Sequence, residues 1–296
     1  MTHPSPHAAH DHAQHVQHMQ HVHQQGHDTT ADQSEILDLD AEVLAEHIAS
    51  ITAWLPIGTS PRRIVDLGCG TGTGTLALLA RFPEAEVTAV DTSAAHLSRL
   101  KEKAEAEGVA GRVRIMRADL DARWPELGTP ELVWASASMH HMADPDRALS
   151  QVHDMLAPGG LFAVVELAGF PRFLPEDAPE DGPGLEERCH AALAHHHAAQ
   201  LPHRGADWGR KLTAAGFVVV DERTIPVDIE GTGNTAVGRY ALSGLRRLRG
   251  GVARMLPAED LAALDQLLDT DSAHSILHRR DLSVRTERTV WAARRA

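Results

Sequence analysis

The sequence predicts an α/β fold with a doubly wound, mainly parallel sheet. Between residues 62 and 167, short apolar runs alternate with segments of helical periodicity, and this alternation is typical of βαβ units. A glycine-rich turn follows the first apolar run and precedes the first helical segment. The length of 296 residues allows one large domain with an insertion.

The first residues of the chain differ in composition from the rest. Nine of the 21 histidines lie within the first 27 residues, among Gln, Ala and Asp and with few large apolar side chains. Such a segment cannot bury enough apolar surface to offset the entropy lost on ordering. We therefore predict a disordered, His-rich tail over residues 1–31. If it became helical, His15, His18 and His21 would lie along one side, so the tail either stays solvated or binds a transition metal.

Ordered structure is expected to begin near Asp32 and to continue to the last residue, as a domain over residues 32–296. Apolar side chains at helical spacing first predict one amphipathic helix, which Pro56 ends. These side chains are Leu37, Leu44, Ile48, Ile51 and Leu55.

Five apolar runs then predict strands, with helical segments between them. The strands are expected over residues 62–67, 87–90, 113–116, 132–136 and 161–167. The helices are expected over residues 73–81, 94–107 and 145–156.

Residues 169–205 interrupt this alternation with a segment rich in proline and glycine around a predicted helix, 185–200. An insertion after the carboxyl end of a strand lies at the edge where α/β sheets bind ligands. We expect residues 169–205 and 235–270 to form a helical lid. The remaining elements are expected as helices over 207–216, 235–256 and 258–268 and as strands over 217–222 and 284–293.

Composition excludes several classes of protein. The chain has 41 acidic and 28 basic side chains, which disfavours a nucleic-acid partner because phosphates select positive surface. No run approaches the roughly 20 apolar residues of a membrane helix, and no secretory signal begins the chain, so we predict a cytoplasmic protein without a membrane partner. The cysteines, Cys69 and Cys189, are too few for a disulfide scaffold or a thiolate zinc site, and we assign no metal ligands in the domain.

The glycine-rich turn indicates a nucleotide site, and its details decide which kind. Glycines let the backbone approach a ligand closely, and the following helix N-terminus adds donors and positive charge. The dinucleotide pattern G-x-G-x-x-G fails here, because Thr73 stands where its last glycine is needed. The P-loop pattern is also missing, since no Gly-Lys-Ser/Thr follows the glycines.

The turn resembles the first motif of class I S-adenosylmethionine-dependent methyltransferases, as Asp66-x-Gly68-x-Gly70-x-Gly72. The resemblance extends through Asp91, after the second predicted strand, and Asp119, after the third. Further matches are the segments 134–145 and 156–161, the former similar to the small-molecule branch of the family.

This resemblance implies a Rossmann-like sheet of seven strands with the last strand antiparallel, and S-adenosylmethionine as the cofactor. It implies that Asp91 binds the ribose hydroxyls and that Asp119 lies near the adenine amino group. The full set of predicted cofactor-binding residues is Asp66, Gly68, Cys69, Gly70, Gly72, Asp91, Thr92, Asp119, Leu120 and Ser136.

The predicted reaction is methyl transfer to a small-molecule acceptor by in-line displacement, which needs no covalent enzyme nucleophile. A general base helps where the acceptor must lose a proton. His140 and His141 follow the fourth predicted strand, where acceptor and cofactor should meet, and either they or Glu166 could act as that base or hold the loop by hydrogen bonds. The acceptor atom and the oligomeric state stay open.

Two other functions compete with methyl transfer. One is a metal-binding or metal-responsive protein that combines the His-rich tail with a cofactor-binding fold. The other is a nicotinamide-dependent oxidoreductase, which the failed dinucleotide pattern disfavours.

Overall fold

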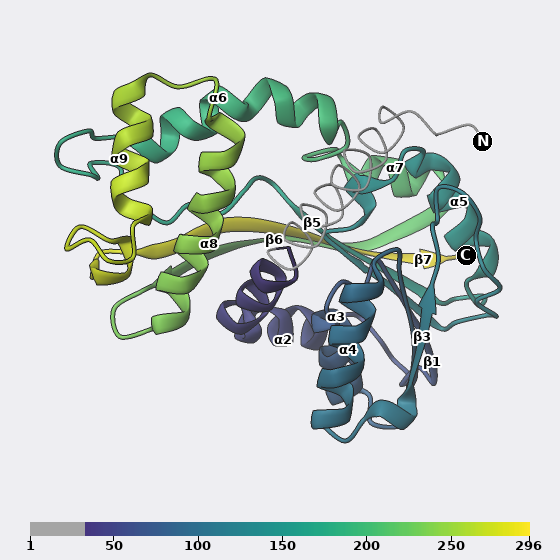
Figure 1. Cartoon of the computed structure of the whole chain (residues 1–296). Helices are drawn as coiled ribbons and strands as arrows, with labels where there is room; N and C mark the ends of the chain where they lie inside the picture. The colour runs from purple at the N-terminus through teal and green to yellow at the C-terminus, as the bar shows by residue number, and fades with distance from the viewer. Residues whose placement is uncertain (1–32) are drawn as a thin grey trace, which may run out of the picture.

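The computed structural model describes residues 33–296, so the predicted tail over residues 1–31 and the start at Asp32 lie outside the described residues. One sheet of seven strands runs through the molecule, in the order β3-β2-β1-β4-β5-β7-β6 (Figure 1). The strands are β1 (Arg63–Leu67), β2 (Glu86–Asp91), β3 (Val113–Arg117), β4 (Leu132–Ser136), β5 (Leu161–Leu167), β6 (Phe217–Glu230) and β7 (Ser283–Arg295).

Strand direction confirms the predicted fold class. Strands β1 to β5 pair in parallel, whereas β7 runs antiparallel to both of its neighbours, β5 and β6. The chain therefore has the Rossmann-like sheet with an antiparallel last strand.

The helices between and after these strands agree with most of the predicted ranges. They are α2 (Ala45–Trp54), α3 (Thr73–Arg81), α4 (Ala94–Ala106), α5 (Pro145–Met155), α6 (Leu185–Gln200), α7 (Trp208–Ala214), α8 (Thr235–Val252) and α9 (Ala258–Leu268). Over residues 33–296, no helix is both long and apolar enough to cross a lipid bilayer.

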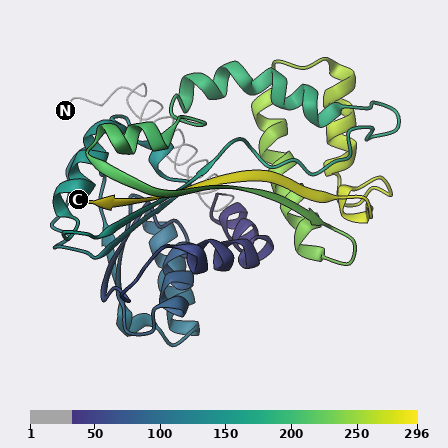
Figure 2. The ribbon, with the colours of Figure 1, turned by 180° about the vertical axis from the view of Figure 1, so that it is seen from behind.

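Strand β4 shows how the two faces of the sheet are covered. Successive side chains of a strand point to opposite faces, and here both faces are buried. Trp134 packs with α2 and α3, whereas Val133 packs with α5 and α7. Helices α2, α3 and α4 thus lie on one side of the sheet and α5 and α7 on the other (Figure 2).

A third helical layer surrounds the long ends of β6 and β7, where α6, α8 and α9 share one apolar core (Figure 1). These are the helices predicted within 169–205 and 235–270. The predicted end of β6 at residue 222 is wrong, because the strand continues to Glu230 opposite Ser283. In the sequence, Pro226 argues against a longer strand. An edge strand such as β6 nevertheless tolerates proline.

The predicted single N-terminal helix is divided at Leu44 into a helix over residues 33–43 and α2. The break is a local bend, since the Leu44 amide still donates to the Asp40 carbonyl at 2.9 Å and the Ile48 amide to the Leu44 carbonyl at 3.0 Å. The Leu44 side chain is fully buried in the core of the third layer, whereas Ile48 and Ile51 pack beneath the sheet. Because of this bend, the N-terminal helical segment packs into two different hydrophobic cores.

Candidate functional site

A cavity of about 460 Å³ opens at the carboxyl ends of β1, β2 and β4. This is the edge where ligands bind in α/β sheets. Except for Gly72, all of the predicted cofactor-binding residues line it: Asp66, Gly68, Cys69, Gly70, Asp91, Thr92, Asp119, Leu120 and Ser136.

The glycine turn packs closely against neighbouring residues at two positions. Gly68 has φ +66°, and a Cβ added there would lie 2.5 Å from the Ser138 Cβ. Gly72 has φ +93°, and its added Cβ would lie 2.2 Å from the Leu100 Cδ1 on α4. Both positions therefore require glycine, but Gly72 faces α4 and not the cavity.

Asp66 lies beneath the glycine turn with its carboxylate buried. Its Oδ2 accepts a hydrogen bond of 2.6 Å from the Thr75 hydroxyl on α3. Burial raises the pKa of Asp66 to about 7, the negative charge of Asp91 adds to this, and Thr75 opposes it. The cavity thus contains a carboxyl group that titrates near neutral pH.

Asp91 ends β2, and its two oxygens hold the turn and the start of α4. Oδ2 accepts from the Gly70 amide at 2.9 Å and Oδ1 from the Ser93 amide at 2.8 Å. Burial alone would raise the pKa of Asp91, but the imidazole of His96 and these two amides outweigh it, so the pKa is lowered. Asp91 is therefore an anion at neutral pH.

Asp119, just after β3, lines the cavity with an exposed carboxylate. Its Oδ1 accepts from the backbone amides of Asp121 at 2.9 Å and Ala122 at 3.4 Å. Within residues 33–296, no hydrogen bond is made to its Oδ2, so that oxygen is available to a ligand.

The two adjacent histidines after β4 have different surroundings. The His140 side chain is only 2% exposed, and its Nδ1 lies 2.5 Å from the Glu166 Oε2. The other oxygen of Glu166 accepts from the His140 amide at 3.2 Å. His141 lines the cavity and His140 does not, so the structure brings only one of the two predicted histidines to the ligand space.

The pKa of His141 is lowered in the folded protein. Its pKa is lowered from 6.5 to about 4, mainly by partial burial and also by the neighbouring His140, Arg204 and Arg247, against an opposite effect of Asp91. The imidazole is therefore neutral at pH 7 and able to accept a proton or a hydrogen bond.

Another wall of the cavity is built from segments far apart in the sequence. Leu37 and Asp40, from the helix over residues 33–43, line the cavity together with Arg288 of β7. Their position depends on contacts between segments about 250 residues apart, since Arg288 pairs with Asp40. No local pattern could have identified this pairing.

Three side chains on the lining have buried atoms that lack hydrogen-bond partners within the described part of the chain. These atoms include the Trp134 indole Nε1, the His96 Nε2 and the Arg288 Nε. Buried polar groups are normally paired, so these atoms indicate that a polar ligand belongs in the cavity. Over residues 33–296, no three His, Cys, Asp or Glu side chains are arranged to hold a metal ion.

Comparison with known proteins relates the central segment of the chain to methyltransferases. The model of a methyltransferase domain matches residues 64–160. A trans-aconitate 2-methyltransferase of Methylobacterium radiotolerans is 36% identical over 116 residues, which are 39% of this chain and 42% of that protein. A demethylmenaquinone methyltransferase of Thermus thermophilus is 36% identical over 119 residues, 40% of this chain and 53% of that protein.

The chain contains a class I methyltransferase domain. S-adenosylmethionine is the cofactor of this class. The matched segments cover about half or less of the relatives' own lengths, 53% for the demethylmenaquinone methyltransferase and 42% for the trans-aconitate methyltransferase. The methyltransferase domain includes the cavity's glycine turn and the carboxylates of Asp66, Asp91 and Asp119, whereas α6, α8 and α9 lie outside it.

One solved structure is similar in fold to this chain over more than the matched domain. A candidate methyltransferase of Bacillus halodurans superimposes with a TM-score of 0.51 over 84% of this chain and 98% of that chain, at 18% identity. At this identity the likeness concerns the fold alone.

Proposed function

We propose that the protein transfers a methyl group from S-adenosylmethionine to a small-molecule acceptor by in-line displacement. The observation that carries this proposal is the convergence of the predicted motif residues on one cavity at the carboxyl edge of the sheet. The methyltransferase domain supports it, because its matched residues include that whole edge from β1 to β4.

The cavity suits the cofactor in size and polarity. Its volume of about 460 Å³ lies within the range of pockets that bind small molecules and cofactors. In the proposed arrangement, Asp91 accepts from the ribose hydroxyls, and the free Oδ2 of Asp119 accepts from the adenine amino group. The turn at Gly68 and Gly70 brings backbone close to the amino-acid part of the cofactor.

When bound, S-adenosylmethionine supplies a methyl group on a positively charged sulfur. The chain's own residues must then orient the acceptor and exclude water. We assign His141 to the acceptor side, where its neutral imidazole can take a proton from the acceptor. Glu166 and His140 are assigned as positioning residues, because their contacts with each other fix the loop that carries His141.

The domain organisation follows from this assignment. We propose residues 32–296 as one catalytic unit, with the insertions 169–205 and 235–270 covering the acceptor. The relatives named above are methyltransferases of trans-aconitate and of demethylmenaquinone, so the likeness does not identify the acceptor of this chain. A metal-binding role of the tail over residues 1–31 and a cytoplasmic location stay predictions from the sequence.

Calorimetry with S-adenosylhomocysteine, followed by an acceptor screen that detects formation of this product, tests the proposal. We expect binding by the wild type and at least tenfold weaker binding by Asp91→Ala, because the ribose hydroxyls lose their acceptor. The control variant Asp154→Ala removes a carboxylate that is 78% exposed and should bind normally. Unchanged affinity in Asp91→Ala, or tight binding of a nicotinamide dinucleotide in place of S-adenosylhomocysteine, would refute the assignment.

A further inference from the structure

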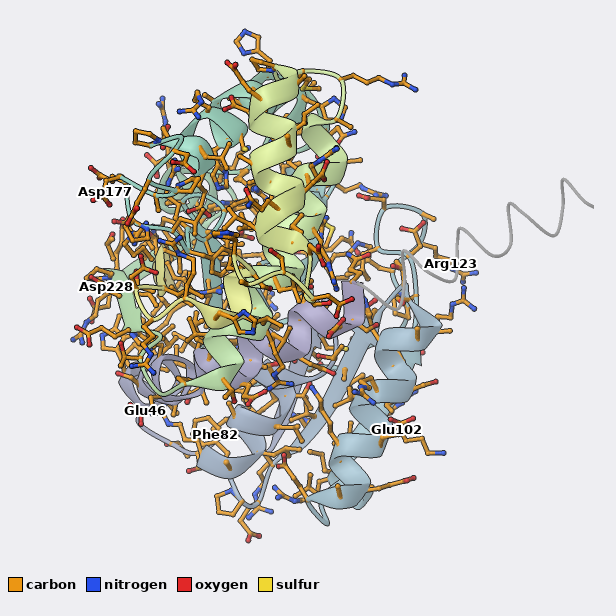
Figure 3. The ribbon with its side chains drawn as sticks, turned by 60° about the vertical axis from the view of Figure 1, so that its left-hand side comes forward. Glu46, Phe82, Glu102, Arg123, Asp177 and Asp228 are labelled. Atoms are coloured by element: carbon orange, nitrogen blue, oxygen red, sulfur yellow. The ribbon has the colours of Figure 1, made fainter. Side chains whose placement is uncertain are left out.

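A second cavity of about 440 Å³ lies between the helix over residues 33–43 and α8. Gln33 lines both cavities, so the second adjoins the first. In Figure 3, α8 stands above the N-terminal helices, while α4, marked by Glu102, lies on their other side. The second cavity is therefore on the side of the third helical layer, away from the glycine turn.

Arginines of α8 give this second cavity a positive wall. Arg239, Arg246 and Arg247 line it, with Glu35 as the acidic residue on the facing helix. Arg239 is neutralised by Glu42 at 2.7 Å. For Arg246 and Arg247, no ion pair is formed with any residue from 33 to 296.

Arg204, in the loop after α6, contributes a further cation from the insertion. Its Cζ lies 3.6 Å from the ring centre of Phe170, which stacks the guanidinium. Its Nε and Nη1 are buried and make no hydrogen bond within the part of the chain that the structure describes. The arginine as a whole is half-buried, but leaving buried donors without hydrogen-bond partners is costly, so these two donors point to a ligand.

Arg247 lines the second cavity and Arg204 lines neither, but Arg204 stacks on Phe170, just after the strand whose Glu166 contacts His140 beside His141. The charges of Arg204 and Arg247 both lower the pKa of the His141 imidazole, after the larger effect of burial. The pKa of Arg204 is lowered mainly by burial, and the nearby carboxylate of Glu166 partly offsets this effect. The oxygens of Glu166 already accept from His140, from Nδ1 and from the amide, so it does not supply Arg204 with a hydrogen-bonded partner.

We propose that Arg204 and Arg247, supported by Arg246, bind an anionic group of the acceptor, a carboxylate or a phosphate, while the end to be methylated faces His141. This inference rests on the proposed function. A guanidinium binds either oxyanion through two parallel N–H donors. The anion would satisfy the buried donors of Arg204 and offset the unpaired charge, so the protein selects charged acceptors over neutral ones.

The test measures acceptor affinity apart from turnover. Full-length protein loaded with S-adenosylhomocysteine is titrated calorimetrically with succinate, citrate, benzoate, glycerol phosphate and inorganic phosphate, and with triethyl citrate as a neutral counterpart. We expect at least one carboxylate or phosphate to bind, and at least tenfold more tightly than triethyl citrate. Whether carboxylates or phosphates bind more tightly identifies the anionic group.

Variants then locate the site. Arg204→Gln and Arg247→Gln should each weaken binding of the anionic probe at least tenfold and leave the Kd of S-adenosylhomocysteine unchanged. The control matched to Arg247 is Arg254→Gln, an exposed arginine just after α8 that, unlike Arg247, does not line the second cavity, and it should bind like the wild type. Arg247 is also exposed, so its variant should fold even if Arg204→Gln does not.

The outcomes separate the two proposals. If S-adenosylhomocysteine binds but no anionic probe does, or if triethyl citrate binds equally well, the inference about the acceptor is wrong and the proposed function stands. If Arg247→Gln and Arg204→Gln bind the probe normally, the anion lies elsewhere and the inference is also wrong. If the wild type does not bind S-adenosylhomocysteine, the proposed function itself fails.

Discussion

Asp40 and Arg288 form an ion pair that closes one side of the cofactor cavity. The Arg288 Nη2 donates to both oxygens of Asp40, at 2.7 and 3.0 Å, and Arg288 is only 4% exposed. The Tyr240 hydroxyl donates to the same carboxylate at 2.6 Å. One side chain thus connects the helix over residues 33–43 to β7 and to α8.

Asp40→Asn should destabilise the protein and weaken cofactor binding. The substitution leaves the Arg288 charge buried without compensation, which costs about 2–3 kcal/mol for a partly screened pair. Denaturant unfolding measures this loss, and calorimetry with S-adenosylhomocysteine measures the effect on the cavity wall. The control is Glu42→Gln, which breaks a pair with Arg239 that is 55% and 53% exposed and should cost less than about 1 kcal/mol. Equal losses in both variants would show that the Asp40 pair has no special role.

Asp66 should release its proton when S-adenosylmethionine binds. With a pKa of about 7, this carboxyl group is largely protonated at pH 6, and the positive charges of the cofactor favour its ionised form. Calorimetric titrations at pH 6 in two buffers of different ionisation enthalpy should therefore give different apparent binding enthalpies. The difference should disappear in Asp66→Asn, and a wild type without such a difference would contradict the prediction.

The same carboxyl group should make stability fall as pH rises. Its pKa in the folded state, about 7, is above the unfolded value near 3.8, so the folded protein binds more protons between these values. Linkage then requires that this contribution is complete below pH 4 and is lost as pH rises towards 7. Unfolding midpoints of Asp66→Asn should show a flatter pH dependence than the wild type over this window.

His141 should have the opposite effect on stability and a direct effect on rate. Its pKa of about 4 lies below the ordinary 6.5, so its contribution is present above pH 6.5 and is lost as pH falls towards 4. If it is the base of the reaction, His141→Asn should lower kcat by about 100-fold or more with little change in KM. His153→Asn on α5 is the control, because this histidine pairs loosely with Asp154 at 3.8 Å and lies outside the cavity. An unchanged kcat in His141→Asn would remove it from the reaction.

Much of the fold could be predicted because its determinants are local. The strand at Leu132–Ser136 and the helices at Thr73–Arg81 and Ala258–Leu268 have the predicted bounds, since apolar runs and flanking glycine or proline define them. The cavity's lining of glycines and acids was also predictable, because parallel strands bring their carboxyl ends to one edge.

What could not be predicted depends on pairing at long range. The extension of β6 to Glu230 is stabilised by β7, more than 50 residues later in the chain, and not by any signal in residues 223–230. The different roles of His140 and His141 depend on the position of Glu166 in the neighbouring strand. Likewise, an exposed-looking Asp40 gives no sign in the sequence that it neutralises Arg288.

Two glycines of the turn offer a final test, because alanine at each should fail in a different way. At Gly72, an added Cβ would lie 2.2 Å from the Leu100 Cδ1, and Leu100 is fully buried. Gly72→Ala should therefore destabilise the protein by about 2 kcal/mol or more, through overpacking and a left-handed backbone. The Kd of S-adenosylhomocysteine should change little where the protein is folded, since Gly72 does not line the cavity.

At Gly70, the nearest side-chain atom to an added Cβ is the Leu37 Cδ1 at 3.5 Å, an ordinary contact. Its φ of +53° should cost alanine only about 1–2 kcal/mol. The methyl group would nevertheless enter the space between the turn and the helix over residues 33–43, and the Gly70 amide holds Asp91. Gly70→Ala should thus weaken binding of S-adenosylhomocysteine more than Gly72→Ala does, although Gly70→Ala should lose less stability than Gly72→Ala. If the variant with the larger loss of stability also loses more affinity, the turn acts only through folding and its proposed contact with the cofactor is wrong.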